Sequence, residues 1–118
     1  MSKGSTEVKS KLFAIKIVNL YKDLTNNKKE FVMSKQLLRS GTSIGANVKE
    51  AVYAQSKLDF LSKMSIALKE ASETEYWLEL LKDTEYIDES TFNDIYSLNV
   101  ELIKLLTSIT KTSKENKL

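Results

Sequence analysis

The scarcity of residues that break a regular backbone constrains this chain more than any other feature. It has no proline, and its three glycines all lie before residue 46. A β-rich fold needs turn residues about every 8–12 positions, and most of this sequence has none. The sequence therefore predicts an all-helical protein.

Apolar residues recur at three- and four-residue intervals in four stretches, which indicates four amphipathic helices. We predict helices over about residues 6–25, 30–54, 57–84 and 89–110, with polar segments at both termini. Asn26 and Asn27 tolerate the left-handed conformation that ends helices, and Ser56 and Asp88 suit N-caps. Short connections make successive helices antiparallel. The prediction is one domain, residues 1–118, folded as an up-down-up-down four-helix bundle.

Each predicted helix has one stripe of core positions. The stripes are Phe13, Ile17, Leu20 and Leu24; Met33, Leu37, Gly41, Ile44, Val48 and Ala51; Leu61, Met64, Leu68, Ala71, Glu75 and Leu78; and Ile95, Leu98, Leu102, Leu105 and Ile109. A glycine inside a helix costs about 1 kcal/mol relative to alanine. Because Gly41 and Gly45 lie on the apolar side, we expect another helix to approach closely there.

A row of polar residues follows the second helix beside these glycines and includes Arg39, the only arginine. On the third helix, Glu75 stands in line with core positions, where a carboxylate needs a partner. Arginine offers a planar fork that suits a buried carboxylate. We hypothesise an internal polar network that fixes the register between the two helices; phosphate binding by Arg39 is the alternative. The network would comprise Arg39, Ser43, Asn47, Glu50, Glu73 and Glu75.

The sequence offers little to support catalysis. It has no histidine and no cysteine, so the commonest general base and the commonest transition-metal ligands are missing. Ser43 has no base to activate it. A formal alternative is an all-carboxylate magnesium or calcium site, whose candidate ligands are Glu70, Glu73, Glu75 and Glu79. We prefer to interpret these residues as exposed acids. We expect no enzyme activity, no bound metal and no cofactor.

Nothing in the sequence indicates a membrane protein. No apolar run approaches the roughly 20 residues that cross a bilayer. The first residues, MSKGSTE, lack the apolar core of a signal peptide. We therefore expect a cytoplasmic protein.

Three of the predicted helices carry apolar residues outside their core stripes, and large exposed apolar patches usually mark interfaces. Tryptophan and tyrosine are common anchors of such interfaces. We therefore expect a homo-oligomer; a monomer with wide core stripes is the alternative. The candidate interface residues are Val8, Leu12, Ile15, Trp77, Leu80, Leu81 and Tyr96.

Charge is distributed unevenly along the chain. Residues 70–94 contain nine acids and one lysine, a net charge of −8, so the remainder carries +10. The predicted topology brings the termini and the turn between the second and third helices to one end. The lysines at this end are candidates for binding RNA or DNA, although no aromatic residue is interleaved with them. The alternative is that the uneven charge only reflects solvated helix faces. They are Lys3, Lys9, Lys11, Lys57, Lys111, Lys114 and Lys117.

Residues 39–51, RSGTSIGANVKEA, resemble the signature of the four-helix-bundle intervening-sequence proteins, roughly Arg-x-x-x-Ser-Ile-x-x-Asn-Ile-x-Glu. The resemblance continues through Asp59-Phe60, Ile66-Ala67 and residues 70–78, and covers nearly the whole chain. Many members have proline at the place of Gly45 and glycine at the place of Ala51. This sequence resembles the Gly-Ala-Asn branch, so its second helix is expected to be straighter.

The resemblance implies an antiparallel four-helix bundle. Members are often encoded within intervening sequences of bacterial 23S ribosomal RNA genes. The family resembles accessory proteins of diversity-generating retroelements, which are basic pentameric barrels that bind nucleic acid. The resemblance therefore implies a homo-oligomer, expected as a pentamer, with RNA or DNA as a partner, and no enzyme. A protein-interaction scaffold without nucleic-acid affinity is the alternative function.

Overall fold

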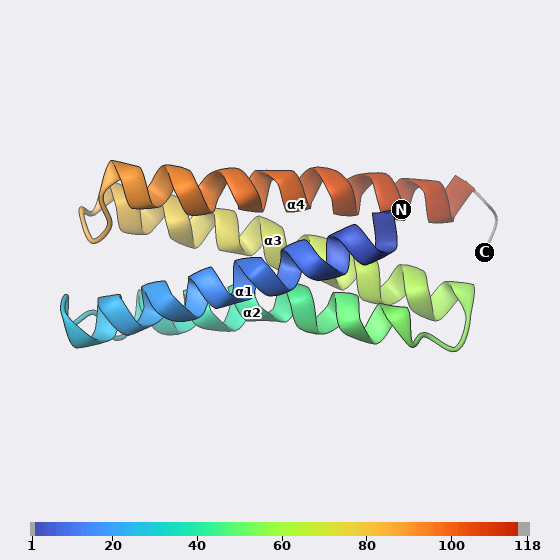
Figure 1. The fold of residues 1–118 in the computed structure, drawn as a ribbon, viewed down its shortest axis with the longest axis horizontal. Coiled ribbons are helices and arrows are strands. Elements are labelled where there is room, and N and C mark those ends of the chain that lie inside the picture. The colour runs from blue at the N-terminus through green and yellow to red at the C-terminus, as the bar shows by residue number, and fades with distance from the viewer. Residues whose placement is uncertain (1, 116–118) are drawn as a thin grey trace.

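The computed structural model describes residues 2–115, with side chains from residue 4 onward, and it shows four long antiparallel helices (Figure 1). They are α1 (Ser2–Asn26), α2 (Met33–Val52), α3 (Lys57–Asp83) and α4 (Glu89–Glu115). The bundle is elongated, 47 × 21 × 20 Å. The all-α, up-down-up-down prediction is confirmed. The main differences are that α1 begins earlier, α2 begins later and α4 continues further than expected.

The four helices occupy the corners of a square. α1 packs against α2 and α4, and α3 packs against the same two helices, so α1 and α3 lie at diagonally opposite corners. The start of α1, the α2–α3 connection and the end of α4 share one end of the long axis (Figure 1). The α1–α2 and α3–α4 connections share the other end.

The core stripes of α1 and α2 follow the prediction except at Met33, which is partly buried, whereas those of α3 and α4 are rotated. In α3, Leu61, Leu68 and Glu75 are only partly buried and flank the true seam. In α4, Leu98, Leu105 and Ile109 likewise lie beside it. The buried positions still follow three- and four-residue spacing, and small or polar residues take part. They are Met64, Ala67, Ala71, Thr74, Leu78 and Leu81 in α3, and Ile95, Asn99, Leu102, Leu106 and Thr110 in α4.

Three polar side chains inside the bundle form hydrogen bonds between helices. The Ser40 and Thr74 hydroxyls, from α2 and α3, are 2.9 Å apart and fully buried. Asn99, also fully buried, donates from Nδ2 to the Ala71 carbonyl oxygen at 3.0 Å and so ties α4 to α3. These bonds offset part of the cost of burying the polar groups and specify how the helices face one another.

The first connection ends α1 and begins α2 with residues that the sequence pattern did not single out. Lys29, and neither asparagine, adopts the left-handed conformation, with φ of 56°. Glu30 was expected to begin the second helix but instead caps it. Its carboxylate accepts the N–H groups of Met33 and Ser34 at 3.0 and 2.7 Å. Although burial raises the pKa of Glu30, these backbone donors lower it overall.

The other two connections use regular caps. The Ser56 hydroxyl accepts the Asp59 N–H at 3.0 Å, and Asp88 Oδ1 accepts the Thr91 N–H at 2.7 Å, as predicted. The latter bond lowers the pKa of Asp88. α3 ends in a Schellman motif, in which the Tyr86 N–H bonds the Leu81 carbonyl oxygen. Glu85 occupies its left-handed position, with φ of 70°, where glycine is usual.

The two helical glycines allow α1 and α2 to come close together, as expected. A Cβ atom on Gly41 would lie 2.9 Å from both Cγ atoms of Ile17, which is fully buried. A Cβ atom on Gly45 would lie 3.3 Å from the backbone oxygen of Ser10. The helix-propensity cost of the glycines is therefore offset by packing that larger residues would prevent.

We predict that Gly41→Ala lowers the free energy of unfolding by about 1–3 kcal/mol, because the β-branched side chain of Ile17 cannot move aside in a filled core. The control is Gly4→Ala, since nothing lies within 4 Å of a Cβ atom there. The control should keep or raise stability by up to about 1 kcal/mol. Urea denaturation of both variants measures the difference; equal stabilities would contradict the close approach.

Candidate nucleic-acid interface

The lysine-rich end retains several lysines without an acidic partner. Lys11, Lys57, Lys111 and Lys114 are exposed, and the ion pairs formed within residues 4–115 involve none of them. Lys9, in contrast, pairs with Glu101 of α4. Lys117 and the side chain of Lys3 lie outside the described residues. The structure thus leaves four of the predicted lysines exposed: Lys57 begins α3, Lys111 and Lys114 are near the end of α4, and Lys11 lies further in along α1.

Lys49, which the sequence pattern did not single out, lies in the last turn of α2 near the same end. With Lys11 and Glu7 it lines a groove of about 320 Å³ between α1 and α2. The floor includes Gly45, so the close approach of the two helices shapes this groove. The position of Lys49, four residues before Tyr53 and the α2–α3 connection, is the signal that would have identified this lysine.

At the opposite end, positive charge is accompanied by acids. Lys28 donates to the Tyr86 carbonyl oxygen at 3.3 Å and helps lower the pKa of Asp88. Glu85 and Glu89 are exposed in the same α3–α4 region. Positive and negative charges at this end therefore partly offset each other.

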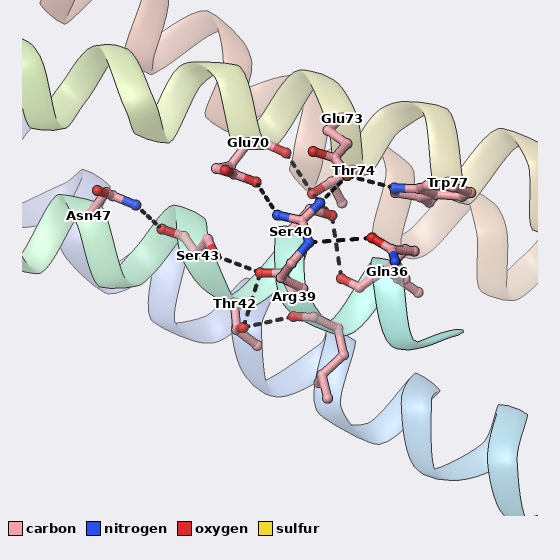
Figure 2. A network of polar contacts seen from close by, with 12 residues as sticks. Gln36, Arg39, Ser40, Thr42, Ser43, Asn47, Glu70, Glu73, Thr74 and Trp77 are labelled. Carbon is pink, nitrogen blue, oxygen red and sulfur yellow. Dashed lines mark hydrogen bonds and ion pairs between the residues drawn. The ribbon is translucent and has the colours of Figure 1, made fainter. Parts of the chain in front are cut away.

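Arg39 is the centre of a surface network that joins α2 to α3 (Figure 2). Its guanidinium pairs with Glu73 and, at 3.2 Å, with Glu70. Glu73 also accepts the indole N–H of Trp77 at 2.9 Å. The arginine side chain is 48% exposed, so the network lies at the edge of the bundle and departs from the internal position that we expected.

The remaining residues of the hypothesised network do not converge on Arg39. Ser43 Oγ donates to the Arg39 carbonyl oxygen at 2.6 Å, and Asn47 Nδ2 donates to the Ser43 carbonyl oxygen at 2.9 Å. Both bonds stay within α2. Glu50 pairs instead with Lys63 of α3 at 3.1 Å.

Glu75 does not pair with Arg39, because Thr74 occupies the buried seam and turns Glu75 toward α4. There the Tyr96 hydroxyl lies 2.8 Å from Glu75 and 2.6 Å from Glu79. Hydrogen bonding to Glu79, burial and Glu75 all raise the pKa of Tyr96. Tyr96 therefore remains a neutral donor that joins the acidic faces of α3 and α4.

The candidate interface residues separate into three groups by exposure. Val8, Leu12 and Ile15 form an exposed strip on α1, with exposed fractions of 68%, 49% and 50%. Leu81 is fully buried and belongs to the core, which corrects the expectation for that residue. The other three side chains are partly buried on α3 and α4: Trp77, Leu80 and Tyr96.

The surfaces and the topology together define a small antiparallel four-helix-bundle protein. The helices found between residues 2 and 115 lack the combination of length and apolarity that a membrane span requires. The chain belongs to the 23S rRNA-intervening sequence protein family, whose model matches residues 7–108. No curated protein matches it.

A solved crystal structure is closely similar to this chain. It is that of a protein with unknown function from the S23 ribosomal protein family of Bacteroides thetaiotaomicron VPI-5482. The two share 59% sequence identity, with a TM-score of 0.92 over 94% of this chain and 99% of that chain. The family relationship that the signature predicted is therefore confirmed.

We predict that Arg39→Met lowers the melting temperature by less than about 5 °C, because a half-exposed ion pair contributes at most about 1 kcal/mol. It should also change the fluorescence of Trp77, the only tryptophan, because Arg39 holds the carboxylate that accepts the indole N–H. Lys35→Met, which removes an exposed charge from the same helix, is the matched control. Unchanged fluorescence in Arg39→Met would show that the network does not position Trp77.

Proposed function

We propose that this protein is a non-enzymatic, cytoplasmic oligomer that binds RNA or other nucleic acid through its lysine-rich end. The observation that carries the proposal is that the exposed lysines toward this end form none of the ion pairs found in residues 4–115: Lys11, Lys49, Lys57, Lys111 and Lys114. Phosphate groups attract clustered lysines and release counterions on binding. The name of the family, 23S rRNA-intervening sequence protein, supports RNA as the first nucleic acid to test.

The non-enzymatic part of the proposal rests on side-chain chemistry. The chain has no histidine or cysteine. Ser43, the one candidate nucleophile considered, directs its hydroxyl to the carbonyl oxygen of Arg39 within its own helix. A hydroxyl held in this way has no base to remove its proton.

Self-association is supported by the strip Val8, Leu12 and Ile15. These three side chains lie on one face of α1 and point away from the α2 and α4 contacts. Exposed apolar rows of this kind usually mark interfaces. The resemblance implies a pentamer, and a closed ring would repeat the lysine-rich end around its axis.

A scaffold without nucleic-acid affinity is the second candidate function, and the ion pairs between α1 and α4 favour it. Lys9 pairs with Glu101, and Lys16 with Asp94 at 3.0 Å. These pairs neutralise two of the lysines that flank the apolar strip, and an interface between proteins benefits from low net charge there.

We predict that the protein binds a stem-loop RNA with an affinity that falls steeply as salt rises. The double variant Lys111→Gln/Lys114→Gln should reduce the slope of log affinity against log salt by about 2, or about 1 per lysine. The matched control Lys22→Gln/Lys35→Gln removes two exposed lysines near the other end and should leave the slope unchanged. Absence of binding at low salt would favour the scaffold.

We predict that Leu12→Glu reduces the molar mass measured by light scattering toward that of the 13.4 kDa monomer, because a carboxylate would be buried in the interface. Leu58→Glu is the control, since Leu58 is 67% exposed in the first turn of α3 and lies outside the strip. Equal masses for wild type and Leu12→Glu would exclude this strip as the interface.

A further inference from the structure

An exposed aromatic residue stands at the lysine-rich end, although the sequence pattern showed none among its lysines. Tyr53 directly follows α2, and its side chain is 74% exposed. Tyr53 belongs to the α2–α3 connection, which lies at the same end of the bundle as the start of α1 and the end of α4 (Figure 1). We propose that Tyr53 is a stacking platform for an unpaired base, so that this end binds single-stranded nucleic acid. This inference rests on the proposed function.

The backbone beneath the Tyr53 ring is held in place on both sides. The Tyr53 N–H donates to the Glu50 carbonyl oxygen at 3.1 Å, and the Ala54 N–H donates to that of Ala51 at 3.1 Å. Three residues later, the Ser56 hydroxyl caps α3. A ring on a fixed backbone loses little conformational entropy when a base stacks on it.

The charge around Tyr53 suits a phosphate backbone. Lys49 lies four residues before it and Lys57 four residues after it, and both are exposed. Neither forms one of the ion pairs found in the described part of the chain. Proteins that bind single strands combine lysines along the backbone with aromatic rings under the bases, which is the combination found here.

The other exposed aromatic side chains have less suitable surroundings. Phe31 is 60% exposed in the α1–α2 connection, but that end also carries Glu85, Asp88 and Glu89. Tyr76 is 56% exposed on α3, and its ring meets the Trp77 ring edge-on at 5.0 Å. Tyr53 is the most exposed of these three aromatic residues, and its neighbours Lys49 and Lys57 form none of the ion pairs found in residues 4–115.

Stacking also defines the class of ligand. Every base has a flat face, so a single aromatic platform accepts all four bases and gives little sequence preference. In a duplex those faces are already stacked on neighbouring pairs, and the ring has no access to them. The end should therefore prefer unpaired RNA or DNA over a duplex of the same length.

The test uses the full-length protein with two fluorescein-labelled probes, a 15-nucleotide oligouridylate and a 15-base-pair RNA duplex, with binding followed by anisotropy. Tyr53→Ala should weaken oligouridylate binding at least about fivefold, the lower range for loss of one stacked base. It should leave the salt slope and the duplex affinity unchanged, since no charge is removed. Tyr53→Phe keeps the ring and should bind as wild type does.

Phe31→Ala is the matched control, because it removes another exposed aromatic ring from the opposite end. Melting curves confirm that each variant folds. If Tyr53→Ala binds oligouridylate as tightly as wild type while Lys111→Gln/Lys114→Gln binds more weakly, the stacking role is overturned and the proposed function stands. If wild type binds neither probe nor the stem-loop RNA at low salt, both are overturned.

Discussion

The contact between Ile17 of α1 and Gly41 of α2 is the constraint on which the rest of the bundle depends. It leaves no room for a methyl group on Gly41 and thereby sets the distance between the two helices. That distance places Gly45 against the Ser10 backbone and shapes the groove that Lys11 and Lys49 line. α3 and α4 are then positioned by the buried Ser40–Thr74 pair and the bond from Asn99 to the Ala71 carbonyl oxygen.

The number, direction and approximate limits of the helices could be predicted because apolar spacing and the lack of proline leave few alternatives. The rotation of α3 could not be predicted, since Leu61, Leu68 and Glu75 repeat with the same period as Ala67, Thr74 and Leu81. A pattern based on size favours the leucines. Close packing of helices instead favours alanine and threonine at the seam, with the larger side chains at its edges.

The candidate site, too, could be predicted only in part. Four lysines could be assigned to one end because chain direction alone determines that position, whereas the partner of Lys9 depends on the rotation of α4. Arg39 was expected inside the bundle because it is the only arginine, yet its long side chain reaches the surface and pairs with Glu70 and Glu73 there. Tyr53 was overlooked because its exposure arises from the position of a turn and has no periodic signal.

Because the bundle is elongated, the symmetry with which subunits associate has a functional consequence. If subunits associate side by side with their axes parallel, the lysine-rich ends lie on one face of the assembly, about 20 Å apart, as the width of the bundle requires. One nucleic-acid chain can then contact several subunits, and avidity raises a weak individual affinity by orders of magnitude without any new contact. If two subunits associate antiparallel, the same ends lie at opposite poles, separated by about the 47 Å length, and each acts alone.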